Sequence, residues 1–348
     1  MKRALGKVIL MGKSTTNDMT VGNPVKLIIR FMIPMCLGNV FQQFYNIADS
    51  IIAGQFLGVN ALAAIGSTGS LMFFVTGWLN GLSSGFAIIV AQMFGARRYD
   101  QMRHYVAMSV YLMAAFSILM TIGFEIANGP ILRLMNSPQE VFGDVKAYMG
   151  VIYAGLIVTA AYNSLAAFLR ALGDSRSPLY FLIISAILNV ILDVVFIVCL
   201  GTGVVGCGYA TVIAQGVSAL CCLVYIIKRF PILHLQKENF EISFASFKKL
   251  LALGIPMGLQ FSITAIGTII VQGAVNVYGA VNMAGFSAAS KIQNIFGTIF
   301  AAMGATVATY VGQNRGAGKM DRVRQGVRYT QMMILIWSAF LMILMFFF

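Results

Sequence analysis

The stretch "FYNIADSIIAG", residues 44–54, places one aspartate, Asp49, inside a long run of apolar residues. After it, no Asp, Glu, Lys or Arg occurs from Ser50 to Ala96. Charged residues make up 10% of the 348 positions and hydrophobic residues 59%, whereas soluble domains contain about 25% charged residues. The composition therefore predicts an all-α protein that crosses a membrane several times. Asp49 is a costly exception that needs a functional or structural reason.

The apolar segments predict nine transmembrane helices, because a spanning helix needs about 20 mostly apolar residues. Glycines and an asparagine in "GQFLGVNALA", residues 54–63, separate the first two segments by a tight turn. The five cysteines fall in or beside apolar runs and show no metal or disulfide spacing. The predicted spans are roughly 26–56, 61–95, 105–127, 147–169, 178–200, 204–227, 248–277, 283–313 and 328–348.

The basic residues predict the orientation of these spans. The N-terminal tail with the entry of the first span, and the segments around the ends of the second, fourth, sixth and eighth spans, hold 21 of the 24 Lys and Arg residues. Basic residues collect on the cytoplasmic side of membrane proteins, so we expect a cytoplasmic N-terminus and a place in the plasma membrane. The net charge of +13 then faces anionic lipid, and no nucleic-acid partner is needed to explain it. The exceptions are Arg133, Lys146 and Lys291.

An internal repeat predicts the domain organisation. "VAQMFGARRYDQMRHYV" (90–106) and "VGQNRGAGKMDRVRQGV" (311–327) share seven of 17 positions at an offset of 221 residues, and "IPM" recurs at 33–35 and 255–257. Six predicted helices separate the copies, so both halves enter the membrane in the same direction, a parallel repeat. We expect a cytoplasmic tail (1–25), an N-lobe of six helices (26–230), a cytoplasmic linker (231–247) and a partial C-lobe of three (248–348). By symmetry a complete protein has twelve helices, and nine are present.

Three polar side chains fall at one predicted depth. Asp49 lies about eight residues before the turn that follows its span, Asp193 about seven before the end of its span, and Thr211 about seven after the start of the next. At 1.5 Å per residue, each lies roughly 10 Å below the outer surface. Asn189 lies on the same helix face as Asp193, one turn deeper. These four residues predict a single site in the N-lobe.

Two kinds of ligand fit such a site. Carboxylate, amide and hydroxyl oxygens suit a hard cation such as Na⁺, and two neighbouring carboxyls can also carry a proton. A purely structural role is the alternative, since intramembrane amides and hydroxyls often hydrogen-bond neighbouring helices. A charge at the centre of a spanning helix costs about 2.5–3.5 kcal/mol, which favours function for the aspartates. No cofactor other than this coupling ion is expected.

The remaining intramembrane polar groups are less specific. Tyr45 lies one turn before Asp49 and Gln42 a further turn before it, which gives a polar and aromatic stripe on one helix face. Asn163 is a lone amide in the fourth predicted span. Glu125 lies beside "NGP" (128–130) near the end of its span, where an interfacial carboxylate is the default interpretation. Lys291 is expected to snorkel to the surface; the alternatives are a counter-charge to the aspartates in the central cavity or a site for an anionic group.

The chain resembles the multidrug and toxic compound extrusion family, MATE, over nearly its whole length from "MTVGNPVKLIIRFMIPM" (19–35) onwards. The most specific motifs are "FYNIADSIIAGQFLGVNALAAIG" (44–66), "VAQMFGARRYD" (90–100), "RALGDSRSP" (170–178), "LNVILDVVFI" (188–197) and "GVVGCGYAT" (203–211). The resemblance implies two six-helix lobes that export drugs and organic cations in exchange for Na⁺ or H⁺. It implies a cation site at Asp49, Asn189, Asp193 and Thr211, and an adjoining drug pocket lined by Gln42, Tyr45 and Asn163.

One departure from the family pattern bears on the coupling site. The NorM-like branch has a glutamate in its seventh helix, but this chain has no acidic residue between Glu241 and Asp321. We therefore expect coupling in the N-lobe, as in the DinF-like bacterial branch. The substrate is expected to be a cationic, amphipathic small molecule, bound by a monomer in the bilayer.

Three other functions fit the sequence less well. A flippase for lipid-linked oligosaccharide or polysaccharide would need basic residues in its cavity to hold a pyrophosphate, but only Lys291 lies deep within a predicted span. An uncoupled channel or structural protein leaves the matched aspartates unexplained. An enzyme is not expected, because His104 and His234 lie in predicted loops without a nucleophile or metal cluster.

Overall fold

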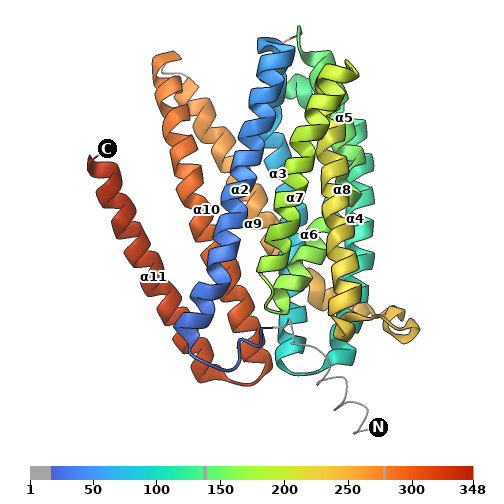
Figure 1. The fold of residues 1–348 in the computed structure, drawn as a ribbon, viewed down its shortest axis with the longest axis vertical. Coiled ribbons are helices and arrows are strands. Elements are labelled where there is room, and N and C mark those ends of the chain that lie inside the picture. Colours follow the sequence, from blue (N-terminus) through green and yellow to red (C-terminus); the bar gives the residue numbers. More distant parts are fainter. Residues whose placement is uncertain (1–16, 136–138, 277–279, 348) are drawn as a thin grey trace.

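The computed structural model is almost entirely helical (Figure 1) and describes residues 17–135, 139–276 and 280–347. Within these ranges, some side chains between 59 and 67, between 269 and 295, and at 345 are outside the description. Residues 1–16 of the predicted tail and the side chain of Lys291 are thus outside the described part of the chain.

In residues 17–135, 139–276 and 280–347, eleven helical elements follow one another in chain order, numbered here as in Figure 1, with two short 3₁₀ helices between α8 and α9. They are α2 (Pro24–Leu57), α3 (Val59–Gly95), α4 (Tyr99–Leu134), α5 (Phe142–Ala154), α6 (Leu156–Ala171), α7 (Arg176–Val194), the π-helical η1 (Val195–Cys199), α8 (Val204–Arg229), η2 (Pro231–Leu233), η3 (Lys237–Phe240), α9 (Phe244–Asn276), α10 (Ala280–Gly316) and α11 (Met320–Phe347).

The predicted spans correspond to these helices, with α5–α6 and α7–η1 each forming one span. Among the described residues, seven helices are by themselves long and apolar enough to cross a membrane, and the bent pair α5–α6 makes an eighth. α10 is not among them, and part of its first half lies where side chains are not described. The protein is a multi-pass membrane protein, as its composition predicted.

The helices alternate in direction, so their connections gather at two ends of the bundle. The start of α2 and the turns after α3, α6, α8 and α10 all lie at the lower end in Figure 1. We call this end, formed by residues 17–24, 95–99, 171–176, 229–244 and 313–322, the basic end. Eight of the basic residues that predicted the orientation lie on these segments: Arg97, Arg98, Arg176, Arg229, Lys237, Arg315, Lys319 and Arg322.

Helix α7 shows why the sequence folds this way in lipid. Its apolar side chains Ile184, Ile187 and Ile191 are exposed on the outside of the bundle, whereas Asn189 and Asp193 are completely buried. Polar groups inside and apolar groups outside are the expected arrangement where the surrounding solvent is hydrocarbon.

The fourth predicted span, 147–169, is not one straight helix. The chain bends by 47° between α5 and α6, at Gly155. A side chain at this glycine would lie 2.3 Å from a methyl carbon of Val212 on α8. The close packing of α8 against the bend therefore requires glycine, which hydropathy alone does not reveal.

Glycines also bring α3 and α9 into close contact. A Cβ at Gly81 would lie 2.6 Å from the Cα of Gly258, and a Cβ at Gly85 would lie 2.6 Å from the Cα of Gly254. Small residues four apart on both helices let the backbones approach within the membrane. This contact joins the first predicted lobe to the second.

The two copies of the sequence repeat meet at the basic end. A Cβ at Gly95 would lie 1.9 Å from the carbonyl oxygen of Gln313, and a Cβ at Gly316 would lie 1.9 Å from the carbonyl oxygen of Gln92. Gly316 corresponds to Gly95, and Gln313 to Gln92, at the 221-residue offset of the repeat. The contact is thus reciprocal, as a parallel repeat about an axis along the membrane normal requires.

We expect Gly95→Ala to lower the melting temperature in detergent by on the order of 5 °C, because overpacking a tight contact costs about 1–3 kcal/mol. Gly123→Ala on α4 is the matched control, since a Cβ there meets nothing within 4 Å. Equal melting temperatures for the two variants would contradict the contact.

Residues before α2 connect the two repeat halves across the basic end. The buried side chain of Gln313 accepts a hydrogen bond from Met19 N (2.9 Å) and donates one to the carbonyl oxygen of Ala171 (2.8 Å). Arg322 donates to the carbonyl oxygens of Met19 (3.2 Å) and Gly22 (2.8 Å). Residues 17–22, which we call the N-terminal strap, are therefore fixed between α10–α11 and the end of α6.

Candidate functional site

A buried cluster of polar side chains lies where α2, α7 and α8 meet. Asn189 is at its centre, with its amide oriented as its partners require. In this orientation Asn189 donates to Asp49 Oδ1 (2.8 Å) and Asp193 Oδ2 (3.2 Å), and accepts from the backbone N–H of Thr211 (3.3 Å). The four residues that depth arithmetic grouped are therefore in direct contact around one amide.

The two carboxyl groups lie within hydrogen-bonding reach of each other. Asp193 is completely buried, and its Oδ1 has no hydrogen-bond partner among the described residues. An unpaired buried carboxylate oxygen is costly unless a proton or a cation completes its surroundings. The cluster therefore lacks a positive partner, which a proton or a small cation would supply.

Local structure sets the positions of these side chains. Asn189 and Asp193 are four residues apart on α7 and share its buried face. Directly after Asp193 the chain widens into the π-helical turn η1, in which Leu200 N bonds to the carbonyl oxygen of Val195 (3.0 Å). Such turns occur frequently at functional sites.

Three further residues surround the cluster. The hydroxyl of Tyr45 donates to Thr211 Oγ1 (3.1 Å), which connects the predicted aromatic stripe to the site. Tyr148 and Cys207 lie near both carboxyl groups. Sequence reasoning missed these two. Cys207 precedes Thr211 by one turn, a spacing that could have indicated it, whereas no sequence signal pointed to Tyr148 on α5.

Gln42 and Asn163 are not joined to this cluster. Gln42 is exposed on α2, and Asn163 is half-buried on α6. In the described part of the chain, neither side chain makes a hydrogen bond. A drug pocket that includes them stays a prediction.

The donor set determines which ligand the cluster can hold. It consists of carboxylate, amide and hydroxyl oxygens, the ligands of hard cations, and the unpaired Asp193 Oδ1 fits one more such contact. In the part of the chain that the structure describes, no three His, Cys, Asp or Glu side chains are grouped as a metal site. The chemistry suits Na⁺ or a proton.

Comparison with known proteins assigns the family. The family model MatE matches residues 34–195 and 256–348, one stretch in each repeat half. The chain belongs to the MatE family. It is 31% identical over 308 residues to the probable multidrug resistance protein YpnP of Bacillus subtilis, covering 88% of this chain and 68% of that protein. A second Bacillus subtilis relative, the probable multidrug resistance protein YoeA, is 28% identical over 305 residues, which cover 86% of this chain and 66% of that protein.

Solved structures of MATE transporters share the fold. A MOP superfamily transporter from Pyrococcus furiosus, described as having a binding pocket of reverse polarity, matches with a TM-score of 0.87 at 25% identity and covers 95% of this chain and 73% of its own. A MATE protein in the bent conformation matches with a TM-score of 0.85 at 26% identity, and the match covers 93% of this chain and 72% of that protein. This MatE chain spans about two thirds to three quarters of these relatives. It is a membrane transport protein rather than an enzyme.

Proposed function

We propose that this MatE protein exports drugs or organic cations across the plasma membrane in exchange for Na⁺ or H⁺, and that Asp49, Asn189, Asp193 and Thr211 bind the coupling ion. The observation that carries the proposal is the buried, unpartnered Asp193 Oδ1 beside a second carboxyl group. The relatives named multidrug resistance proteins support the substrate class.

Coupling follows from competition for the same carboxyl groups. When the coupling ion occupies the cluster, the negative charge of the carboxyl groups is neutralised, so a cationic substrate is bound less well. When the ion leaves on the other side, the freed carboxylates attract a new cationic substrate. A ligand shifts the transporter between states only if it binds those states with different affinity, and competition supplies this difference.

The orientation belongs to the same proposal. With the basic end in the cytoplasm, the cluster lies in the outer half of the membrane, close to the ends of α2 and α7. The N-terminal strap then closes the cytoplasmic side, and the bond from Met19 N to Gln313 or the bond from Gln313 to the Ala171 carbonyl oxygen must break before that side opens. All four proposed ligands come from one chain, so a monomer is sufficient for the site.

The test is efflux from cells that produce the protein, with the Na⁺ gradient and the pH gradient varied separately. Ethidium is the cationic probe, and FAD is the anionic one because a relative 24% identical is named an FAD transporter. We expect ethidium efflux driven by one of the two gradients. Efflux of FAD but not of ethidium would overturn the cationic substrate, and efflux independent of both gradients would overturn the antiport.

A further inference from the structure

The second repeat half has a counterpart of the N-terminal strap. The strap ends 12 residues before Pro34 of the first "IPM" motif, and Phe244 lies 12 residues before Pro256 of the second. The residues around this position, 235–247, lead from η2 through η3 into α9. We call them the linker segment. Like the strap, the linker segment lies at the basic end.

The strap and the linker segment each cross to the other repeat half. The strap precedes the first half but binds α10 and α11 of the second. The linker segment leads into the second half but lies on α4 of the first, where the Phe240 ring meets the Tyr111 ring edge-on at a centroid distance of 6.1 Å. His104 of α4 and Ser246 also share a hydrogen bond (3.0 Å). Two reciprocal crossings therefore join the repeat halves at this end.

Hydrogen bonds hold the strap. Within residues 17–22, Met19 is the one buried apolar side chain, and it lies in a small apolar cluster beside Tyr310. The backbone of the strap makes five further contacts, all of them hydrogen bonds to polar side chains of the second half. These side chains are Gln313, Asn314, Lys319 and Arg322.

The first half has no equivalent set of hydrogen bonds. At the 221-residue offset, the four positions hold Gln92, Met93, Arg98 and Gln101. None of these side chains makes a hydrogen bond within the part of the chain that the structure describes. The linker segment is held mainly by apolar packing instead. Leu235 and Phe247 lie against the main apolar core of the first half, and Leu250, near the start of α9, is completely buried in it.

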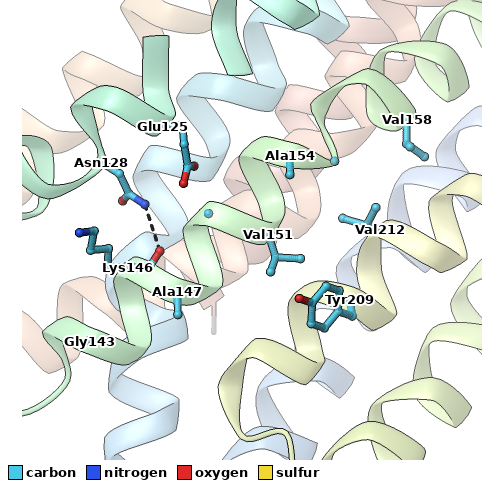
Figure 2. A pocket seen from close by; sticks show the side chains of 12 residues that line it. Glu125, Asn128, Gly143, Lys146, Ala147, Val151, Ala154, Val158, Tyr209 and Val212 are labelled. Atoms are coloured by element: carbon cyan, nitrogen blue, oxygen red, sulfur yellow. Dashed lines mark hydrogen bonds between the residues drawn. The ribbon is translucent and has the colours of Figure 1, made fainter. Parts of the chain in front are cut away.

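Helix α4, on which the linker segment lies, is itself fixed within the first half. Farther along α4, Thr121 Oγ1 donates to the carbonyl oxygen of Tyr153 on α5 (2.7 Å), and Asn128 Nδ2 donates to that of Lys146 (3.0 Å; Figure 2). At the basic end, Met102 is completely buried in an apolar cluster that includes residues of α3, α6 and α8. The linker segment is therefore attached to the body of the first half.

The two crossings differ in how they respond to water. Water can replace the hydrogen bonds of a released strap, whereas apolar surfaces that separate in water are not compensated. We propose that the basic end opens on one side: the strap releases α10 and α11, while the linker segment stays on α4. The start of α9 then moves with the first half, although the repeat assigns it to the second. The proposal rests on the opening of this end in the proposed function.

The test compares how fast two buried positions react with a soluble maleimide in purified protein in detergent. Thr20→Cys places a thiol on the strap and Ser246→Cys places one on the linker segment, at positions that are 6% and 7% exposed. Each rate is the excess over protein with only the five native cysteines, divided by the rate for the same variant in SDS. We expect Thr20→Cys to react about tenfold faster, because a site that opens locally is labelled in proportion to its open population. Ser246→Cys weakens the bond to His104, so slow labelling there does not come from an added contact.

Two further substitutions separate the crossings. Gln313→Met should speed labelling of Thr20→Cys and leave Ser246→Cys unchanged. Phe240→Ala should speed labelling of Ser246→Cys only, and Phe244→Ala is its matched control, because Phe244 is 83% exposed. Equal rates for the two cysteine variants, a faster Ser246→Cys, or a Gln313→Met that speeds both would overturn the proposal. The reaction needs no substrate or ion gradient, so its outcome is independent of whether the protein exports ethidium.

Discussion

Asp193→Asn is expected to reduce gradient-driven efflux of ethidium at least tenfold, to the level of cells without the protein. The substitution keeps the size of the side chain but removes the carboxyl group whose Oδ1 is buried and unpaired. Asp49 alone then holds the coupling ion, without the second carboxylate of the pair. Losing one charged contact in a buried site costs on the order of 3 kcal/mol, more than the 1.4 kcal/mol that corresponds to tenfold.

The control for this result is Asp144→Asn, the same substitution at an exposed position on α5. Both variants should reach the membrane in equal amounts, because Asp193→Asn replaces a buried charge by a neutral group and Asp144 faces solvent. Thr211→Val removes one oxygen from the same cluster and should give an intermediate loss. If Asp193→Asn exports ethidium as fast as the wild type, the carboxyl pair is structural and the proposed coupling is wrong.

Gln313→Met is expected to open the basic end. The substitution removes two buried hydrogen bonds, one to Met19 N and one to the carbonyl oxygen of Ala171, and leaves both backbone groups without a partner. Each such buried group costs about 1–3 kcal/mol. A cysteine placed at Ala171, which is 1% exposed, should therefore react with a soluble maleimide at least tenfold faster in this variant.

The repeat supplies the matched control, Gln92→Met. Gln92 is the equivalent residue in the first copy, but its side chain makes no hydrogen bond in the described structure, so labelling at residue 171 should not change. Reactivity is counted as the excess over the same variant without the introduced cysteine, because five native cysteines are present. Arg322→Ala, which removes bonds to the N-terminal strap, should act in the same direction, and Arg324→Ala, which is exposed, should not. Equal labelling in all variants would show that the strap does not seal this end.

Part of the candidate site was predictable because it depends on distance along a helix. Asp49 lies eight residues before the end of α2, Asp193 six before the end of η1 and Thr211 seven after the start of α8, so their shared depth follows from the rise per residue. That they also share one side of the bundle does not follow, because depth says nothing about rotation of one helix against another. The structure supplies this through Asn189, which contacts residues on all three helices.

The sequence by itself determined the membrane class, the positions of the helices, their alternating direction and the parallel repeat. Each of these properties depends on local features of the sequence: the hydropathy of a segment, the charge of a loop, or residue identity at a fixed offset. Only the tertiary structure decided how the helices are turned and where they approach. The reciprocal contacts of Gly95 and Gly316, the bend at Gly155, the position of Tyr148 and the strap across Gln313 join residues far apart in the chain. Such contacts depend on the crossing and packing of whole helices, and no local pattern specifies them.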